Sequence, residues 1–231
     1  MIVLITAVVL VVSVTFAAIF RHTTTVERIF SVSNFSAQSV VWFDGLSDAQ
    51  MSAYKGDYGV EASIDPDAAN YIGNLRAKVL YKGAGVGLIR VRMVEEWSTT
   101  SGGVRTVQPY NLHMPYTMSV TYSGSGNKKA WLDNRMNDYC FYYTTPVYSA
   151  GMSEIPLITG VDLSNFDLGV LPSDTVVHIL FETDAVQVNR YPQYWNLTEL
   201  PWANGVSATE LELSTFTTTT TTTTTTTQAG S

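Results

Sequence analysis

The sequence is short of cysteine, charge and histidine, and each shortage narrows the classes of protein to consider. The single cysteine, Cys140, cannot form an internal disulfide, so the fold does not depend on a disulfide framework. Charged residues make up 14% of the chain and the net charge is −7, so we expect no nucleic-acid partner. His22, His113 and His178 form no zinc-binding spacing with Cys140 or with one another.

Catalytic motifs are missing as well. The chain contains no G-x-S-x-G elbow, no phosphate-binding loop and no dinucleotide-binding fingerprint. We therefore expect a protein that is not an enzyme and needs no cofactor or metal. The apolar fraction of 45% is that of a chain that packs a core, which excludes general disorder.

The first 20 residues form an uncharged, mostly apolar stretch. Thr15 and Ala17 stand three residues and one residue before a cut after Ala17, as signal peptidase requires. We predict that residues 1–17 are a cleaved signal peptide, so that the chain meets the membrane only before processing and is then secreted to the cell surface. A retained membrane anchor is the alternative, because a basic start is missing and Arg21 follows the apolar stretch.

The other end is a Thr-rich tail, residues 204–231, with eleven consecutive threonines at 217–227. Such a segment cannot build a core, and we predict an extended, flexible stalk. Two N-x-S/T triplets make Asn34 and Asn196 candidate glycosylation sites.

Between these ends, apolar and polar residues alternate with the period of a β-strand. Leu75 and Val79 alternate with Arg76 and Lys78, and the same pattern recurs at 89–93, 118–122, 139–145 and 175–188. Residues 82–85 (KGAG) read as a turn between the first two runs. Many short strands separated by turns predict an all-β fold over residues 36–203, an antiparallel β-sandwich or jelly roll.

Smaller features complete the prediction. Residues 47–55 and 65–70 are the only candidate helices. Cys140 is expected to be a buried small hydrophobe, and His178 a surface or interface histidine. Two oxygen-rich loops, at 133–138 and 162–167, are candidates for calcium, although Asp and Asn are common in turns anyway.

Four segments in the same order resemble a family of exported proteins, the TasA and camelysin proteins, which include fibre subunits of biofilm matrices. The start at 17–32 is similar to that of proteins processed by the SipW-type signal peptidase. Residues 89–97 (IRVRMVEEW) resemble the family's Y-V-R-V-x-V-x-x-x-W strand, and residues 182–187 (ETDAVQ) resemble its closing strand. Residues 138–143 (DYCFYY) resemble its D-G-Y-Y-Y-Y strand, with Tyr139 in place of the glycine.

The resemblance implies a jelly-roll domain that assembles with copies of itself into filaments. In the fibre-forming members, the segment after the signal peptide donates a strand to the neighbouring subunit. Here that segment lies within residues 18–35, roughly 19–33, and Ile29, Phe30 and Val32 would be its anchors. Some relatives are catalogued as metallopeptidases, but the sequence shows no metal-binding motif.

We therefore predict a secreted structural subunit of an extracellular filament or biofilm matrix. Three alternatives stay open. One is a surface-anchored carbohydrate-binding or adhesion module, because the chain has five Trp and 13 Tyr. The others are a secreted metallopeptidase-like protein and a pilin-like subunit that keeps its hydrophobic N-terminal helix.

Overall fold

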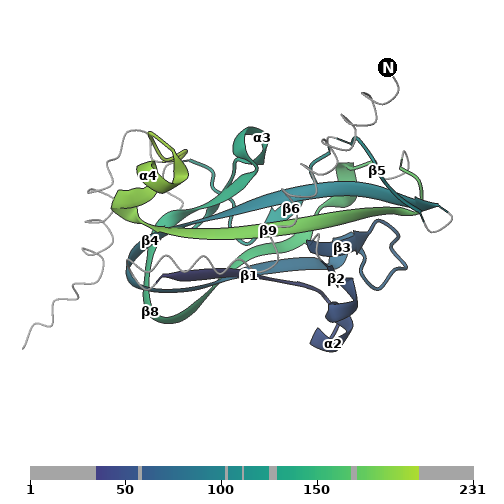
Figure 1. Ribbon diagram of the computed structural model, residues 1–231, viewed down its shortest axis with the longest axis horizontal. Helices are drawn as coiled ribbons and strands as arrows, with labels where there is room; N and C mark the ends of the chain where they lie inside the picture. The colour runs from purple at the N-terminus through teal and green to yellow at the C-terminus, as the bar shows by residue number, and fades with distance from the viewer. Residues whose placement is uncertain are drawn as a thin grey trace, which may run out of the picture.

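The computed structural model describes residues 35–56, 59–101, 104–110, 112–124, 129–167 and 171–202. The predicted all-β class is confirmed: within these residues nine strands form one sheet, and every pairing between them is antiparallel (Figure 1). Several predictions lie outside the described residues, namely the cleavage at Ala17, the donor anchors Ile29, Phe30 and Val32, the sequon at Asn34, and the Thr-rich tail.

The strand order is β2-β3-β9-β4-β8-β6, with β1 and β5 also paired to β4 and with β7 paired to β8. The strands are β1 (Ser36–Phe43), β2 (Lys55–Gly56), β3 (Gly59–Ser63), β4 (Leu75–Ser101), β5 (Val104–Val107), β6 (Tyr116–Met118), β7 (Trp131–Asp133), β8 (Cys140–Val161) and β9 (Thr175–Gln187). The α-helices are α2 (Asp48–Met51), α3 (Arg135–Asp138) and α4 (Tyr191–Trp195). Short 3₁₀ turns occupy η1 (Ser52–Tyr54), η2 (Ile72–Asn74), η3 (Leu163–Asn165) and η5 (Val188–Arg190).

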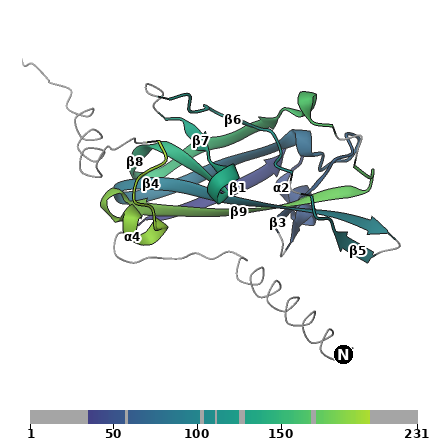
Figure 2. The ribbon, with the colours of Figure 1, turned by 90° about the horizontal axis from the view of Figure 1, so that it is seen from above.

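Two long strands give the sheet its shape. The 27-residue β4 pairs with β1 along residues 75–82 and with β9 along residues 87–99. On its other side it pairs with β8 in both parts. Because β4 and β8 bend between these parts, the sheet folds over, and Figures 1 and 2 show β1 and β9 in its two halves.

The predicted turn at residues 82–85 is wrong, since these residues lie inside β4. The pairing of β4 with β8 shifts register there, which is how a strand bends without ending. The glycines make room for an aromatic ring: a Cβ on Gly83 would lie 2.4 Å from the Tyr81 hydroxyl, and one on Gly87 would lie 2.5 Å from it. Glycine within a strand here marks a close approach rather than a chain reversal.

The main core lies between the two halves of the sheet. The predicted inward residues Leu75, Val79 and Val91 are buried, whereas Arg92 on the opposite face is exposed. The largest fully buried side chains of the main core are Trp97, Trp131, Tyr81, Phe43 and Phe141. Truncating a buried Trp or Phe to Ala typically costs about 3–5 kcal/mol, so these aromatic rings stabilise the fold strongly.

One predicted helix is confirmed and the other is wrong. Residues 47–55 contain α2 and η1, and Ser47 and Gln50 form a capping box at the start of α2. Residues 65–70 form turns instead. The Asp65 carboxylate accepts the Asp67 N–H at 3.0 Å, and the Asn70 side chain donates to the Glu61 carbonyl at 3.0 Å. These side-chain bonds compete with helical ones, as is common for Asp and Asn.

A second apolar cluster packs α4 and the chain after it against β4, β8 and β9. It includes Cys140, which is 3% exposed, so its prediction as a buried residue is confirmed. Burial is the main reason that the pKa of the Cys140 thiol rises to about 11, which keeps it protonated and unreactive. Asn196 follows α4 at φ 55° and is exposed, so its side chain is accessible, and its glycosylation stays a prediction.

Candidate functional site

One side of the folded sheet ends in strands without a further neighbour. β1 pairs only with β4, and residues 180–187 of β9 also pair only with β4, as far as the described residues show. Both strands flank β4 on the side opposite to β8, so their unpaired sides belong to the same edge of the sheet. We call these unpaired sides of β1 and of residues 180–187 the β1–β9 edge.

The two halves of the sheet touch at this edge through polar side chains. The hydroxyls of Ser39 on β1 and Thr183 on β9 are hydrogen-bonded to each other. Unpaired main-chain groups along such an edge are a template for an added strand.

The interior side chains at the β1–β9 edge are incompletely covered. Ala37, Phe181 and Ala185 pack against the main core but are only partly buried. By contrast, Val41 and Phe43 at the far end of β1 are buried. The core is therefore thinnest where the edge is open.

The described chain begins at the bend of the sheet, beside this edge. A Cβ on Gly83 would lie 2.4 Å from the Phe35 ring, and a Cβ on Gly87 would lie 3.1 Å from it. Gly87 pairs with Gln187, the last residue of β9. The predicted donor segment, which directly precedes Phe35, therefore joins the domain next to the β1–β9 edge.

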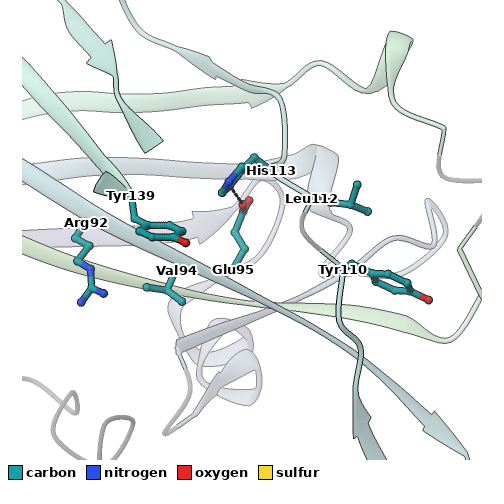
Figure 3. A pocket seen from close by; sticks show the side chains of 7 residues that line it. All are labelled: Arg92, Val94, Glu95, Tyr110, Leu112, His113 and Tyr139. Atoms are coloured by element: carbon teal, nitrogen blue, oxygen red, sulfur yellow. Dashed lines mark hydrogen bonds and ion pairs between the residues drawn. The ribbon is translucent and has the colours of Figure 1, made fainter. Parts of the chain in front are cut away.

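A second opening lies on the other side of β4 and is polar. It is a cavity of about 350 Å³, lined by Arg92, Val94, Glu95, Tyr110, Leu112, His113 and Tyr139 (Figure 3). In Figure 3, the Glu95 side chain points toward His113, with Tyr139 on one side and Leu112 and Tyr110 on the other.

Glu95 is the centre of a buried polar cluster behind this cavity. Its side chain is 3% exposed. Its Oε1 accepts from the Tyr116 hydroxyl at 2.8 Å and from the Met114 N–H at 3.1 Å. Its Oε2 lies 3.2 Å from His113 Nδ1. Burial raises the pKa of the Glu95 carboxyl, against the opposing effects of the Arg135 charge and of these hydrogen bonds.

Arg135 supplies the compensating charge. Its Nη1 lies 3.7 Å from Glu95 Oε2, and its Nη2 donates to Asp133 Oδ2 at 2.8 Å. Its guanidinium lies between the rings of Tyr116 and Phe141, 5.0 and 4.8 Å from their centroids. The contacts hold the loop before β6 and the start of β8 against β4, so the cluster stabilises this corner of the fold.

Sequence reasoning missed both charged residues. The burial of Glu95 could have been predicted, because residues 91, 93, 95 and 97 lie on the same face of the strand. Val91, Met93 and Trp97 on that face are apolar and buried. A carboxylate at an inward position of an alternating strand predicts a buried charge with a partner. For Arg135 no comparable pattern exists in the sequence.

Tyr139 adopts a backbone conformation that favours glycine. Its φ is 61°, it follows α3, and its side chain is half exposed. Left-handed backbone costs a residue other than glycine roughly 1–2 kcal/mol.

His178 was predicted as a surface or interface histidine, and a surface position is wrong for the described chain. The residue is 9% exposed, and its Nε2 lies 3.1 Å from both the Ser98 hydroxyl and Arg105 Nε. Burial and, secondarily, the Arg105 charge lower the pKa of His178. A charged side chain from the β5 hairpin covers it, which strand alternation alone does not predict.

The two loops considered for calcium use their carboxylates internally. Asp133 binds Arg135, Asp138 accepts from the Tyr142 hydroxyl at 2.6 Å, and Asp162 accepts from Ser164. Within the described part of the chain, no group of three or more His, Cys, Asp or Glu side chains is placed to hold a metal ion. No helix there is long and apolar enough to cross a membrane.

No protein-family model, curated protein or solved structure matches the chain at a significant level. The resemblance to the TasA and camelysin proteins therefore stays a prediction from the sequence.

Proposed function

We propose that the protein is a secreted structural subunit of an extracellular filament or cell-surface matrix. Residues 19–33 of one copy would pair with the β1–β9 edge of the next copy. In this proposal the folded sheet is a jelly roll with one strand position left open. The observation that carries it is the β1–β9 edge itself, where unpaired strands and a thinly covered core coincide.

The interior of the edge suits an incoming strand with larger side chains. Ala37 and Ala185 occupy little volume, so apolar side chains from a donor could cover the partly buried core on either side of the Ser39–Thr183 contact. Residues alternate across a strand, so Phe30 and Val32 of the donor would point inward together. Ile29 would then lie on the outer face, which makes it the weakest of the three anchors.

Binding of this kind draws on two sources of energy. The main chain of the donor satisfies the hydrogen-bonding groups of the open strand, and its apolar side chains leave water. Burying a Phe and a Val side chain contributes about 1.5–3 kcal/mol each.

A segment that closes the edge of its own chain would give a monomer instead of a filament. Only Ser33 and Asn34 separate Val32 from Phe35, so a hairpin back onto β1 would need a two-residue turn. The two modes differ in concentration dependence, because closure within one chain is independent of protein concentration whereas assembly between chains is not.

The test is polymerisation of the processed chain. Deleting residues 19–33, or replacing Phe30 and Val32 by Asp together, should leave a folded domain that forms no filaments in sedimentation and negative-stain microscopy. Val104→Asp is the matched control, because Val104 is 66% exposed on β5 and also exchanges an apolar residue for an acid. Filaments formed by the deleted chain would show that the donor role is wrong.

Export is part of the proposal and has its own test. N-terminal sequencing of the protein recovered outside the cell should find a start close to residue 18. A start at Met1 in a membrane-bound form would favour the retained anchor instead.

A further inference from the structure

The polar cavity on the other side of β4 lies where strand pairing is interrupted. The Met93 N–H donates to the Tyr139 carbonyl at 2.8 Å, and the Trp97 carbonyl accepts from the Gln108 N–H at 2.8 Å. Alternate residues of a strand direct their main-chain groups to the same side, so those of Glu95, midway between, face the cavity as well. In the described residues they have no main-chain partner on that side.

Exposure supports this placement. The side chain of Glu95 is 3% exposed, yet the residue as a whole is partly exposed, so what water reaches is its main chain. The cavity therefore presents an N–H donor and a carbonyl acceptor in a fixed geometry. A ligand with both donor and acceptor groups fits such a pair, and hydroxyl groups supply both.

The charged side chains around the cavity already have partners within the protein. Glu95 and Asp133 share Arg135, and Arg92 at the rim lies 3.0 Å from Glu182. Since each of these charges is already paired inside the fold, the cavity favours a neutral ligand over an anion or a cation.

Tyr139 adds an aromatic surface at the mouth. Its ring is half exposed and its centroid lies 6.2 Å from that of His113. Its left-handed backbone is a local strain of the kind that accumulates at ligand sites. The weakly positive C–H groups on one face of a sugar ring pack well on the negative face of such a ring.

We infer that this cavity is a binding site for one residue of a neutral saccharide. The sugar ring would lie on Tyr139, and its hydroxyls would pair with the main chain of Glu95 and with His113. The volume of about 350 Å³ is near the lower end of the range of small-molecule sites and holds one or two sugar units at most. This inference does not depend on filament assembly, because the cavity and the β1–β9 edge flank β4 on opposite sides.

The test is saturation-transfer NMR on the full processed chain with four probes. Three are neutral (methyl β-glucopyranoside, methyl β-galactopyranoside and N-acetylglucosamine), and glucuronate is the anionic one. We expect at least one neutral probe to bind with a dissociation constant on the order of 1 mM, a strength typical of a dozen ligand atoms.

Tyr139→Gly removes the aromatic surface at a position where glycine is the favoured residue, so the fold should survive. We expect binding to weaken by at least about tenfold, the effect of losing one good contact. Tyr139→Asn is a second variant, since Asn also tolerates the left-handed region. Tyr148→Ala is the control, because Tyr148 is 56% exposed on β8 and does not line the cavity.

Three results would overturn the inference. They are the absence of binding by every neutral probe, binding of glucuronate alone, and unchanged affinity in both folded Tyr139 variants. Loss of the neutral probe in the Tyr139 variants but not in Tyr148→Ala would support it.

Discussion

The sheet is left incompletely paired on both sides of β4, at the cavity beside Glu95 and at the β1–β9 edge, and the two places differ in the side chains that lie behind them. At the Glu95 cavity, the chain places its own charges and hydrogen-bonding side chains behind the gap, so the buried side chain of Glu95 is paired while its main chain stays open to the cavity. At the β1–β9 edge, the interior side chains are apolar or carry a hydroxyl, and the core beneath stays partly exposed. The charged side chains behind the first gap have partners inside the fold, whereas the core behind the second stays partly uncovered.

The difference indicates what each region needs. Where buried ion pairs lie behind a gap, mutations should affect the stability of the fold, because removing one charge leaves the other buried without a partner. A gap bordered by unpaired strands is a matter of association, since a segment from elsewhere can complete it. Mutations on the two sides should therefore have different readouts.

The largest effect on stability is expected from Arg135→Met. The change leaves the carboxylate of Glu95 buried without its cation and removes the stacking between Tyr116 and Phe141. We expect the free energy of unfolding to fall by about 3–5 kcal/mol, measured by urea denaturation. Adding Glu95→Leu should recover part of the loss, and Met136→Ala, at a residue 81% exposed, should change little. A stable single variant would contradict the cluster's role.

At the β1–β9 edge, we expect that supplying the donor strand as a separate peptide stabilises the domain. A synthetic peptide of residues 19–33, added to the protein lacking them, should raise its unfolding temperature. At a concentration 100-fold above the dissociation constant, the gain is about 2.7 kcal/mol. The same peptide with Asp at Phe30 and Val32 is the control. If both peptides act alike, or neither acts, the edge does not accept this segment.

A third comparison uses pH. Burial raises the pKa of Glu95 in the folded protein above its value in the unfolded chain. The contribution of this group to stability is therefore full below the unfolded pKa and declines as pH rises through the folded pKa. As pH rises from the unfolded to the folded pKa of Glu95, the free energy of unfolding of the native protein should fall relative to that of Glu95→Gln. Above the folded pKa the difference should stay constant. Denaturation curves measured from pH 4 to 8 test both expectations. A difference that grows with pH would contradict the raised pKa.

The smallest effect is expected from Tyr139→Gly. Relief of the left-handed backbone should stabilise the protein by about 1 kcal/mol, offset by the loss of a half-exposed ring. The unfolding temperature should thus be equal or slightly higher, which calorimetry can measure. A clear decrease would mean that Tyr139 contributes more packing than its exposure indicates.

Strand alternation predicted the inward faces of β4 and β9, and residues 47–55 were predicted as a helix, because both depend on local sequence. The bend in β4 was not predicted, because glycine is common both in turns and where a strand approaches an aromatic ring. The sequence around Gly83 does not show that the ring of Tyr81 lies beside it. The Glu95–Arg135 pair was missed because its partners meet only after the sheet has formed. The β1–β9 edge is likewise a property of topology, and no single segment of the sequence encodes it.

Amide hydrogen exchange in assembled and unassembled protein, read by mass spectrometry, tests the central claim most directly. We predict that assembly slows exchange along β1 or along residues 180–187 of β9, where main-chain groups now lack a neighbour. Exchange around Glu95 should stay unchanged, because the cavity lies on the side of β4 opposite to the β1–β9 edge. Filaments in which the β1–β9 edge exchanges as fast as in the monomer would contradict the account.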